Sequence, residues 1–325
     1  MKGFENSYDP MSIKIIFLGT SAGVPTKERN VTSILLVRKG EYIFFDFGEG
    51  TQRQLFTIGM GFISKMKIFI THTHGDHILG LPGLLQTLCL FKRTAPLNIY
   101  GPPQLASFID FMIDFLNIDL TFEIKFHPVR DGDLFDFKEY YIKALRNKHA
   151  GLSFSYMFKE YDKPGRFNVE LALKRGVPKT IWSKLARGED VRINDKIFKA
   201  SEYLIPPAIR GRKIVISGDT MPFQEMVSFA KGADVLIHEA TYSKKFFDRS
   251  LKTQHTVAED AAKIAKEANV KILVLTHLSA RYGDPNELLL EARRIFPATF
   301  IASDFDIIEI PYIGRIIKKL HGITA

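Results

Sequence analysis

The residues best suited to chemistry are concentrated in a short run, positions 71–77, which reads THTHGDH. His72 and His74 are two apart on an extended chain, so their imidazoles point to one side and can share a metal ion. Asp76 and His77 follow where a helix is expected to begin, and they reach the other way. Burying this cluster for packing alone would leave several polar groups unsatisfied. The run therefore predicts two adjacent metal sites.

Further ligands are expected where other predicted strands end. His149 follows a strand predicted at 140–145, Asp219 follows one at 214–217, and His277 follows one at 271–275. Folds with alternating strands and helices build their sites from side chains at strand ends. Taken singly, each residue also fits a structural role, because Gly-Asp-Thr is a common turn and cap sequence. Their occurrence together beside the histidine run favours metal binding, whereas His127 and His321 are interpreted as structural.

The elements that must position these side chains differ between the two halves of the chain. Short β-branched and aromatic runs dominate the first half, with helical periodicity between some of them. The strands are predicted at 13–18, 33–37, 42–46, 67–71, 97–100, 121–127, 140–145 and 153–158, and the helices at 52–58, 79–90 and 102–116.

The second half alternates strands with helices. Strands are predicted at 214–217, 235–238 and 271–275, and helices at 222–230, 257–268 and 286–296. A strand-rich half and an α/β half in one chain favour two mixed sheets packed face to face with helices outside. The predicted fold is thus an α/β (α+β) four-layer αββα sandwich over residues 11–325, preceded by a flexible lead at 1–10.

Composition narrows the class of protein. The chain has 325 residues, 46% hydrophobic and 25% charged, which is ordinary for a globular protein. The single cysteine, Cys89, cannot form an intramolecular disulfide, and no secretory signal or membrane-length apolar run is evident. We therefore expect a cytoplasmic protein without a membrane partner or a nucleotide cofactor. The net charge of +9 suits a polyanionic partner.

A basic segment from about residue 159 to 192 fits neither half. It contains nine Lys or Arg against five Asp or Glu and is punctuated by Pro and Gly. We interpret it as an inserted, protruding basic arm, and the alternative is a solvated linker.

Several longer stretches resemble the metallo-β-lactamase superfamily and, within it, the ribonuclease Z family of tRNA 3′ endonucleases. Besides the H-x-H-x-D-H run, they comprise PTKERN at 25–30, DFGEGTQ at 46–52, HEAT at 238–241 and THLSARY at 276–282. The resemblance extends from about residue 13 to 310. The chain differs from many members by reading VPKT at 177–180, where they carry Gly-Pro, and Thr-Val after His255, where Ser-Thr is usual.

The resemblance implies a specific set of ligands for two Zn²⁺ ions per subunit. One ion would be held by His72, His74 and His149, and the other by Asp76, His77 and His277. Asp219 would bridge them. Asp46 would orient the histidine run from outside the ligand set, as carboxylates next to metal-binding imidazoles commonly do.

The implied reaction is hydrolysis of a phosphodiester in a tRNA precursor, which removes the 3′ trailer and leaves a 3′-hydroxyl on the tRNA. Two zinc ions about 3.5–4 Å apart can hold a bridging hydroxide as the nucleophile. Asp76 is interpreted as the general base. His255, oriented by Glu239, would protonate the departing oxygen, and the alternative is that this pair only supports the ligands.

The resemblance also implies a precursor tRNA as substrate and a homodimer. Lys27, Arg29 and Asn30 would position RNA near the scissile phosphate, with Arg281 as a further phosphate contact, since guanidinium groups pair with phosphates. In the arm, basic side chains would contact the tRNA backbone: Lys163, Arg166, Lys174, Arg175, Lys179 and Lys184.

Two other functions remain open from sequence. One is a phosphodiesterase or other hydrolase of the same fold that acts on a small molecule, which would need neither the arm nor the PTKERN loop. The other is a non-catalytic RNA-binding protein, which the intact set of candidate ligands disfavours. Metal content together with cleavage of a 3′-extended tRNA precursor distinguishes the three.

Overall fold

The computed structural model describes residues 12–62, 65–206, 208–312 and 316–319. The predicted lead at 1–10 and His321 lie outside the described residues. The chain divides into two compact units, of which the first contains Met1–Leu134, Lys143–Met157 and Ile214–Ala325, and the second contains Phe135–Ile142 and Phe158–Lys213. In the described part of the chain, no helix is both long and apolar enough to cross a membrane.

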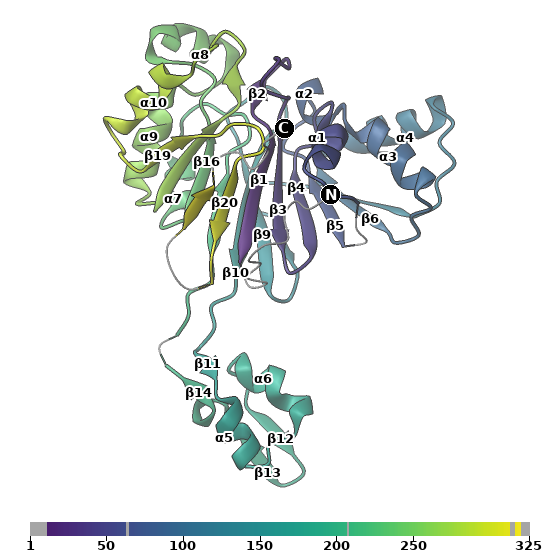
Figure 1. Cartoon of the computed structure of the whole chain (residues 1–325), viewed down its shortest axis with the longest axis vertical. Helices are drawn as coiled ribbons and strands as arrows, with labels where there is room; N and C mark the ends of the chain where they lie inside the picture. Colours follow the sequence, from purple (N-terminus) through teal and green to yellow (C-terminus); the bar gives the residue numbers. More distant parts are fainter. Residues whose placement is uncertain (1–11, 63–64, 207, 313–315, 320–325) are drawn as a thin grey trace. The chain divides into compact units, whose positions relative to one another are not determined.

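One large mixed sheet carries the N-terminal strands (Figure 1). Its order is β21-β20-β1-β3-β4-β5-β6-β7. Pairing is antiparallel from β21 to β4 and parallel from β4 to β7. The strands are β1 (Ile13–Gly19), β3 (Ser33–Arg38), β4 (Glu41–Phe45), β5 (Met66–Phe69), β6 (Leu97–Gly101), β7 (Ile124–Pro128), β20 (Ile307–Ile310) and β21 (Ile317–Lys319).

A second large sheet has the order β19-β17-β16-β15-β10-β9-β8, with parallel pairing from β15 to β19. Its strands are β8 (Leu134–Asp136), β9 (Tyr140–Arg146), β10 (Phe154–Glu160), β15 (Lys213–Ile216), β16 (Val235–Glu239), β17 (Ile272–Thr276) and β19 (Thr299–Ile301). A separate short pair joins β2 (Ser21–Ala22) to β18 (Leu278–Ser279), so the segment after β1 lies beside the segment after β17.

Helices lie outside both sheets, which makes the four layers of an αββα sandwich (Figure 1). On the first sheet they are α1 (Thr51–Thr57), α2 (Gly75–Ile78), α3 (Leu81–Leu90) and α4 (Leu105–Phe115). On the second they are α7 (Gln224–Ala230), α9 (Ala258–Glu267) and α10 (Asn286–Arg293), with η3 (Lys244–Phe246) and α8 (Phe247–Thr253) in the connection between β16 and α9. The predicted fold class is confirmed.

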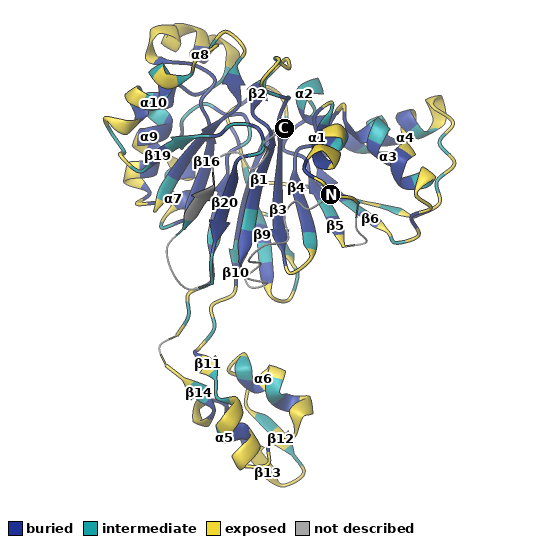
Figure 2. Ribbon diagram, viewed as in Figure 1, coloured by how far each residue is buried: buried dark blue, intermediate teal, exposed yellow. Residues whose placement is uncertain are grey.

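Neighbouring residues on one strand fill different layers of the core. Phe44 belongs to the apolar cluster shared with the outer helices. Phe45 points the other way, and its ring lies 6.0 Å from that of Tyr156 on the second sheet. Successive side chains of a strand alternate between its two faces, and β4 is covered on both, which explains its almost continuous apolar sequence. Figure 2 shows both sheets buried along most of their length.

The elements differ from the predicted ones in a few places. The helix predicted at 79–90 begins at Leu81 as α3, and a separate short helix, α2, precedes the predicted range. The Gly80 N–H between them donates to the Phe47 carbonyl oxygen at 3.0 Å and not to the preceding turn. The strand predicted at 121–127 begins only at Ile124. Strands β19 and β20 and helix α8 were not predicted.

The second unit contains the predicted arm segment, and it is folded. It contains β11 (Arg166–Phe167) paired with β14 (Leu204–Ile205), β12 (Val191–Ile193) paired with β13 (Lys196–Phe198), α5 (Val169–Lys174), η1 (Lys179–Ile181), α6 (Trp182–Ala186) and η2 (Ala200–Glu202). A small apolar cluster that includes Leu185, Phe198 and Tyr203 holds these elements together. The function and limits of the arm stay predictions.

Candidate metal centre

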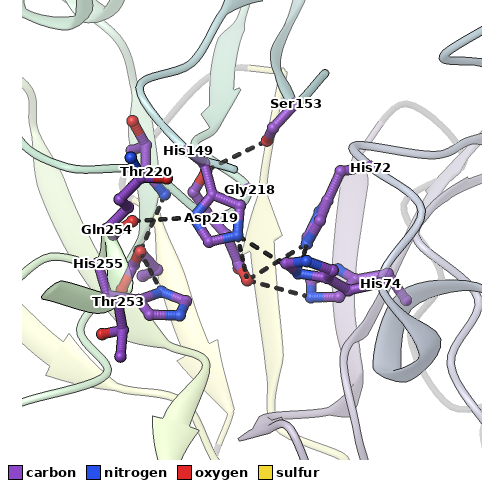
Figure 3. A network of polar contacts seen from close by, with 12 residues as sticks. His72, His74, His149, Ser153, Gly218, Asp219, Thr220, Thr253, Gln254 and His255 are labelled. Atoms are coloured by element: carbon purple, nitrogen blue, oxygen red, sulfur yellow. Dashed lines mark hydrogen bonds and ion pairs between the residues drawn. The ribbon is translucent and has the colours of Figure 1, made fainter. Parts of the chain in front are cut away.

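The predicted ligands lie together at the ends of strands of the first unit. His72, His74, His149 and Asp219 offer ligand atoms within 4.8 Å of one another, and so do Asp76, His77 and His277. His149 comes from the connection between β9 and β10, Asp219 from the turn after β15 and His277 from the end of β17. Figure 3 shows Asp219 pointing between the imidazoles of His72, His74 and His149. Side chains far apart in sequence thus converge on one carboxylate.

The spacing of these atoms matches metal coordination. In a tetrahedral zinc site with bonds of about 2.0–2.1 Å, neighbouring ligand atoms lie roughly 3.3–3.4 Å apart. Asp76 Oδ2 lies 3.4 Å from His77 Nε2 and 3.3 Å from His277 Nε2. Asp219 Oδ2 lies 3.4 and 3.3 Å from the same two nitrogens. Four of the six distances among these atoms thus have the length expected in a tetrahedral zinc site.

The other group is comparable but less regular. His74 Nδ1 lies 2.9 Å from His72 Nε2 and 3.3 Å from His149 Nε2. Asp219 Oδ2 is 3.5 Å from His72 Nε2 and 4.0 Å from His149 Nε2. Because the same carboxylate oxygen belongs to both groups, Asp219 is placed to bridge two ions.

For three of the imidazoles, a hydrogen bond to a residue outside the cluster determines which ring nitrogen carries the proton. His149 Nδ1 lies 2.9 Å from the carbonyl oxygen of Gln254, which can only accept, so Nδ1 donates and Nε2 keeps its lone pair. His77 Nδ1 donates to Asp46 Oδ2 at 2.7 Å. His277 Nδ1 lies 2.9 Å from Thr241 Oγ1. In each case the Nε2 atom that faces the centre is left free to bind a cation.

Asp46 holds the histidine run, residues 71–77, through hydrogen bonds. Its Oδ1 accepts the Thr71 N–H at 2.7 Å, while its Oδ2 holds His77. The residue has a left-handed backbone with φ of 61°, a conformation uncommon outside glycine. Gly48, two residues on, lets the chain approach the turn, since a Cβ there would lie 2.3 Å from the Asp76 carbonyl oxygen. Asp46 thus contacts the histidine run at two points, and its role towards a metal stays a prediction.

Two buried atoms and an excess of negative charge support a cation at this place. Among the described residues, His77 Nε2 and Asp219 Oδ1 have no hydrogen-bond partner although both are buried. Burial opposes the charged form of His77, yet Asp219, Asp46 and Asp76 outweigh it and raise the pKa of this imidazole well above its usual value. A bound cation would balance the negative charge of the carboxylates that converge on these imidazole nitrogens. The donor set, imidazole with carboxylate, suits zinc.

Glu239 and His255 form a pair beside the cluster, as predicted from sequence. His255 Nδ1 donates to Glu239 Oε1 at 2.8 Å. The carboxylate is itself fixed by the Thr220 N–H at 2.9 Å and the Thr241 hydroxyl at 2.7 Å. Burial opposes the imidazolium, but Glu239 outweighs it and raises the pKa of His255 to about 9. The side chain of His255 is 14% exposed, so it can reach a bound substrate.

The predicted RNA-contact residues of the first unit have different surroundings. Lys27 and Arg281 are exposed, and the Arg281 guanidinium lies over the rings of Tyr242 and Phe246, at 5.0 and 4.5 Å from their centroids. Arg29 instead donates to Thr20 Oγ1 and the Ala302 carbonyl oxygen. Asn30 is buried and donates to the Glu49 carbonyl oxygen. Their contacts with RNA stay predictions.

The predicted arm residues lie in the second unit. Arg166, Lys174, Lys179 and Lys184 are exposed, and Lys163 is half-buried. Arg175 is exposed as well, pairs with Glu202 at 2.8 Å and lies over the ring of Tyr203. Among the residues of this unit that the structure describes, none supplies a ligand to the groups described above.

Some supporting residues were not identified from sequence. Thr241 contacts both His277 and Glu239, and it stands inside the HEAT stretch, so the motif contained the signal. Thr71 lies 3.0 Å from His72 Nδ1 through its hydroxyl. The contact between Gln254 and His149 uses a backbone carbonyl oxygen, so the type of residue at position 254 does not predict it. His127, interpreted as structural, bonds Asn98 at 3.0 Å and stacks on Tyr100.

Comparison with known proteins identifies relatives along nearly the whole chain. A ribonuclease Z of Nitrosopumilus maritimus is 43% identical over 299 residues, which is 92% of this chain and 100% of that protein. A ribonuclease Z of Methanosarcina mazei is 38% identical over 302 residues, 92% of this chain and 99% of that protein. A family model described as anti-Pycsar protein Apyc1 matches residues 13–163.

Solved structures agree on the fold. The human tRNase Z, short form, superposes with a TM-score of 0.66 at 30% identity, covering 92% of this chain and 99% of that one. The metallo-β-lactamase fold protein YhfI of Bacillus subtilis reaches a TM-score of 0.64 at 20% identity, over 92% of this chain and 99% of that one, which supports the fold alone. The chain therefore belongs to the ribonuclease Z family of endoribonucleases and has the metallo-β-lactamase fold.

Proposed function

We propose that this protein is a zinc-dependent endoribonuclease that removes 3′ trailers from tRNA precursors and leaves a 3′-hydroxyl on the tRNA. The observation that carries the proposal is the convergence of imidazoles and carboxylates on Asp219, at distances suited to two metal ions. Relatives named ribonuclease Z, similar along their whole length, support the substrate.

His72, His74 and His149 would hold one zinc ion, Asp76, His77 and His277 the other, and Asp219 would contact both. When bound, two such ions would activate a water molecule as the nucleophile and would neutralise charge that develops on the phosphate. The protein fixes the ligands in place through Asp46, Thr241 and the Gln254 carbonyl oxygen, so the imidazoles need no reorientation when substrate binds.

Asp76 is the proposed general base. Burial opposes ionisation of its carboxyl, but His77 and His277 outweigh burial and hold the pKa of Asp76 well below its usual value. It is therefore ionised at neutral pH. Its Oδ2 also accepts the N–H of Gly23 at 2.8 Å, which restrains the position of the carboxylate.

His255 is the proposed general acid. Departure of the 3′-oxygen of the tRNA requires a proton, and the imidazolium of His255 can donate it from Nε2 while Nδ1 stays bonded to Glu239. Despite burial, Glu239 raises the pKa of His255 above its usual value, which favours the imidazolium at neutral pH. Glu239 holds the ring and stabilises its charge, as a carboxylate partner does for other catalytic histidines.

Basic side chains away from the centre are proposed to bind the tRNA. Lys27 and Arg281 would contact phosphates near the scissile bond, with Arg29 and Asn30 in the same loop. The basic residues of the second unit would contact the tRNA body: Lys163, Arg166, Lys174, Arg175, Lys179 and Lys184. Lysine and arginine contacts to the backbone carry affinity without reading sequence.

We also propose a cytoplasmic homodimer. An exposed apolar surface on α1 and directly after α2 and α3 supports the assembly, because a second copy would bury it. Phe56, Leu79 and Phe91 are 43%, 50% and 59% exposed, and the rings of Phe56 and Phe91 lie 6.2 Å apart. Phe91→Arg should shift the mass measured by sedimentation to that of one chain, and a monomeric unmodified protein would contradict the assembly.

The central test uses the full chain with a 3′-extended tRNA precursor. We expect two zinc ions per chain, cleavage at the 3′ side, a tRNA product with a free 3′-hydroxyl that a ligase extends, and loss of activity after chelation. An unreactive precursor together with hydrolysis of the small diester bis(p-nitrophenyl) phosphate would favour the small-molecule hydrolase. RNA binding without any hydrolysis would favour the non-catalytic protein.

A further inference from the structure

The segment between β1 and β3 touches the metal centre through one backbone group. The N–H of Gly23 lies 2.8 Å from Asp76 Oδ2. Gly23 has φ of 72°, and a Cβ built there would meet nothing within 4 Å. The position thus needs glycine for its backbone conformation and not for lack of space. A carboxylate of the centre is held by a loop that contributes no ligand.

The same loop is anchored at its base by a buried carboxylate. Asp304, in the turn between β19 and β20, is 4% exposed. Its Oδ2 accepts the Asn30 N–H at 2.7 Å, and its Oδ1 accepts the Thr20 hydroxyl at 2.7 Å. Gln54 on α1 donates to Oδ2 as well, at 2.8 Å. Both ends of the loop are therefore bonded to one side chain.

Arg29 strengthens this anchor. Its guanidinium donates to Thr20 Oγ1 at 2.7 Å and to the Ala302 carbonyl oxygen at 2.6 Å. It bridges the loop to the turn that carries Asp304. Between these fixed ends, residues 23–25 and Lys27 are exposed, so the anchor leaves the tip of the loop in solvent.

We propose that Gly23 and Asp304 are positioning residues for Asp76: the Asp304 carboxylate fixes the loop from Thr20 to Asn30, and the loop fixes the Asp76 carboxylate through the Gly23 N–H. The inference rests on the proposed function, because it assigns Asp76 to the reaction. The inference thereby links the turn between β19 and β20, near the C-terminal end of the sequence, to the carboxylate of Asp76.

The physical reason is that, apart from the imidazoles of His77 and His277, the Gly23 N–H is the polar contact of the Asp76 carboxylate among the described residues. A carboxylate that binds a cation can rotate about its Cβ–Cγ bond, and a fixed N–H donor to one of its oxygens favours one rotamer. Outer hydrogen bonds of this kind typically change metal affinity or activity by about 10- to 100-fold. The effect should act on any diester, because it is exerted on the protein and not on the RNA.

The first experiment compares Gly23→Ala with Gly40→Ala. Gly40, in the turn between β3 and β4, has φ of 70° and equally open surroundings, so both variants force the same unfavourable backbone on alanine. We expect Gly23→Ala to lower kcat about 10- to 100-fold on both the tRNA precursor and bis(p-nitrophenyl) phosphate, with little change in KM. Zinc affinity, measured by competition with a chelator, should fall as well. Gly40→Ala should change none of these.

The second experiment compares Asp304→Asn with Gln54→Met. Asp304→Asn turns one of the two acceptors into a donor, so either the Asn30 N–H or the Thr20 hydroxyl loses its acceptor. Gln54→Met removes the hydrogen bonds to the same carboxylate and to the Leu18 carbonyl oxygen but leaves the contacts between Asp304 and the loop intact. Only Asp304→Asn should reproduce the loss of kcat and of zinc affinity. Equal effects of the two variants would overturn the proposal, because the loss would then follow from general destabilisation.

The outcomes separate this inference from the proposed function. If Gly23→Ala slows the RNA reaction alone, the loop acts by contacting RNA, and the positioning role is wrong while the endoribonuclease stands. If Gly23→Ala matches Gly40→Ala, positioning is wrong as well. If the unmodified chain hydrolyses only the small diester, the proposed substrate fails, and the comparison on that diester still tests the positioning of Asp76.

Discussion

The buried carboxyl of Asp304 makes a quantitative prediction about stability. Burial raises its pKa from 3.8 to about 6, against the opposing effects of the hydrogen bonds from Asn30 and Thr20 and the charge of Arg29. Arg29 is the cation that faces it, and Gln54 and Thr20 are neutral. A difference of about two pH units between the folded and unfolded chains corresponds to roughly 3 kcal/mol, at 1.36 kcal/mol per unit.

The sign follows from proton binding. Because the folded pKa is the higher one, the folded chain holds the Asp304 proton more tightly than the unfolded chain does. The stability gained from this proton is complete below about pH 4 and is lost as the pH rises through about 6. Relative to Asp304→Asn, which cannot ionise, the unmodified protein should therefore lose roughly 3 kcal/mol of unfolding free energy between pH 4 and pH 7.

The assay is urea unfolding of both proteins, followed by circular dichroism at several pH values from 4 to 7.5. A chelator is present throughout, so that metal binding contributes to neither. All other titrating groups are shared and cancel in the difference, provided that the two proteins have equal m-values. The reasoning is refuted if the difference in unfolding free energy between the two proteins does not change with pH, or if it shifts in favour of the unmodified protein as the pH rises. The hydrogen bonds to Asp304 and the charge of Arg29 would then outweigh the effect of burial on its pKa.

Four further outcomes follow from the site. His72→Ala and Asp76→Ala should each lose about one zinc ion per chain by elemental analysis and abolish cleavage; full activity in chelated buffer would contradict this. His255→Ala should keep both ions yet slow cleavage roughly 10²- to 10⁴-fold; loss of zinc would instead favour a supporting role. Lys27→Ala should raise KM for the precursor and spare the small diester, and equal losses on both would indicate misfolding. Replacing residues 164–208 by a short Gly/Ser bridge should flatten the salt dependence of tRNA affinity while keeping zinc and diester hydrolysis. This bridge is feasible because Lys163 and Ile209 exchange backbone hydrogen bonds; an unchanged slope would remove the arm from tRNA binding.

Sequence predicted which side chains gather in this cluster because their placement follows from secondary structure. Alternation along a strand places His72 and His74 on one side, and strand ends bring Asp219 and His277 to the same edge. None of this requires knowledge of side-chain packing. The residues predicted as ligands are the ones that converge in the structure.

The unpredicted parts depend on tertiary contacts. Strand β20 completes the first sheet beside β1, but its segment lies almost 300 residues from its partner, and periodicity cannot identify such a pairing. Helix α8 has only seven residues and ends at Gln254 in a left-handed conformation, so it carries little periodic signal. That ending presents the Gln254 carbonyl oxygen to His149, a role that the side chain does not reveal.

The PTKERN loop illustrates how one sequence motif contains residues with different tasks. Resemblance groups Lys27, Arg29 and Asn30 as RNA contacts. In the structure Lys27 alone of these is exposed, while the Arg29 guanidinium and the Asn30 side chain bond to the protein itself. A substitution of Arg29 therefore disturbs the anchor of the loop, and with it the Gly23 donor to Asp76, before it removes any phosphate contact. Loss of activity on a small diester in an Arg29 variant would follow from this arrangement, and it would not by itself exclude a role for the loop in binding RNA.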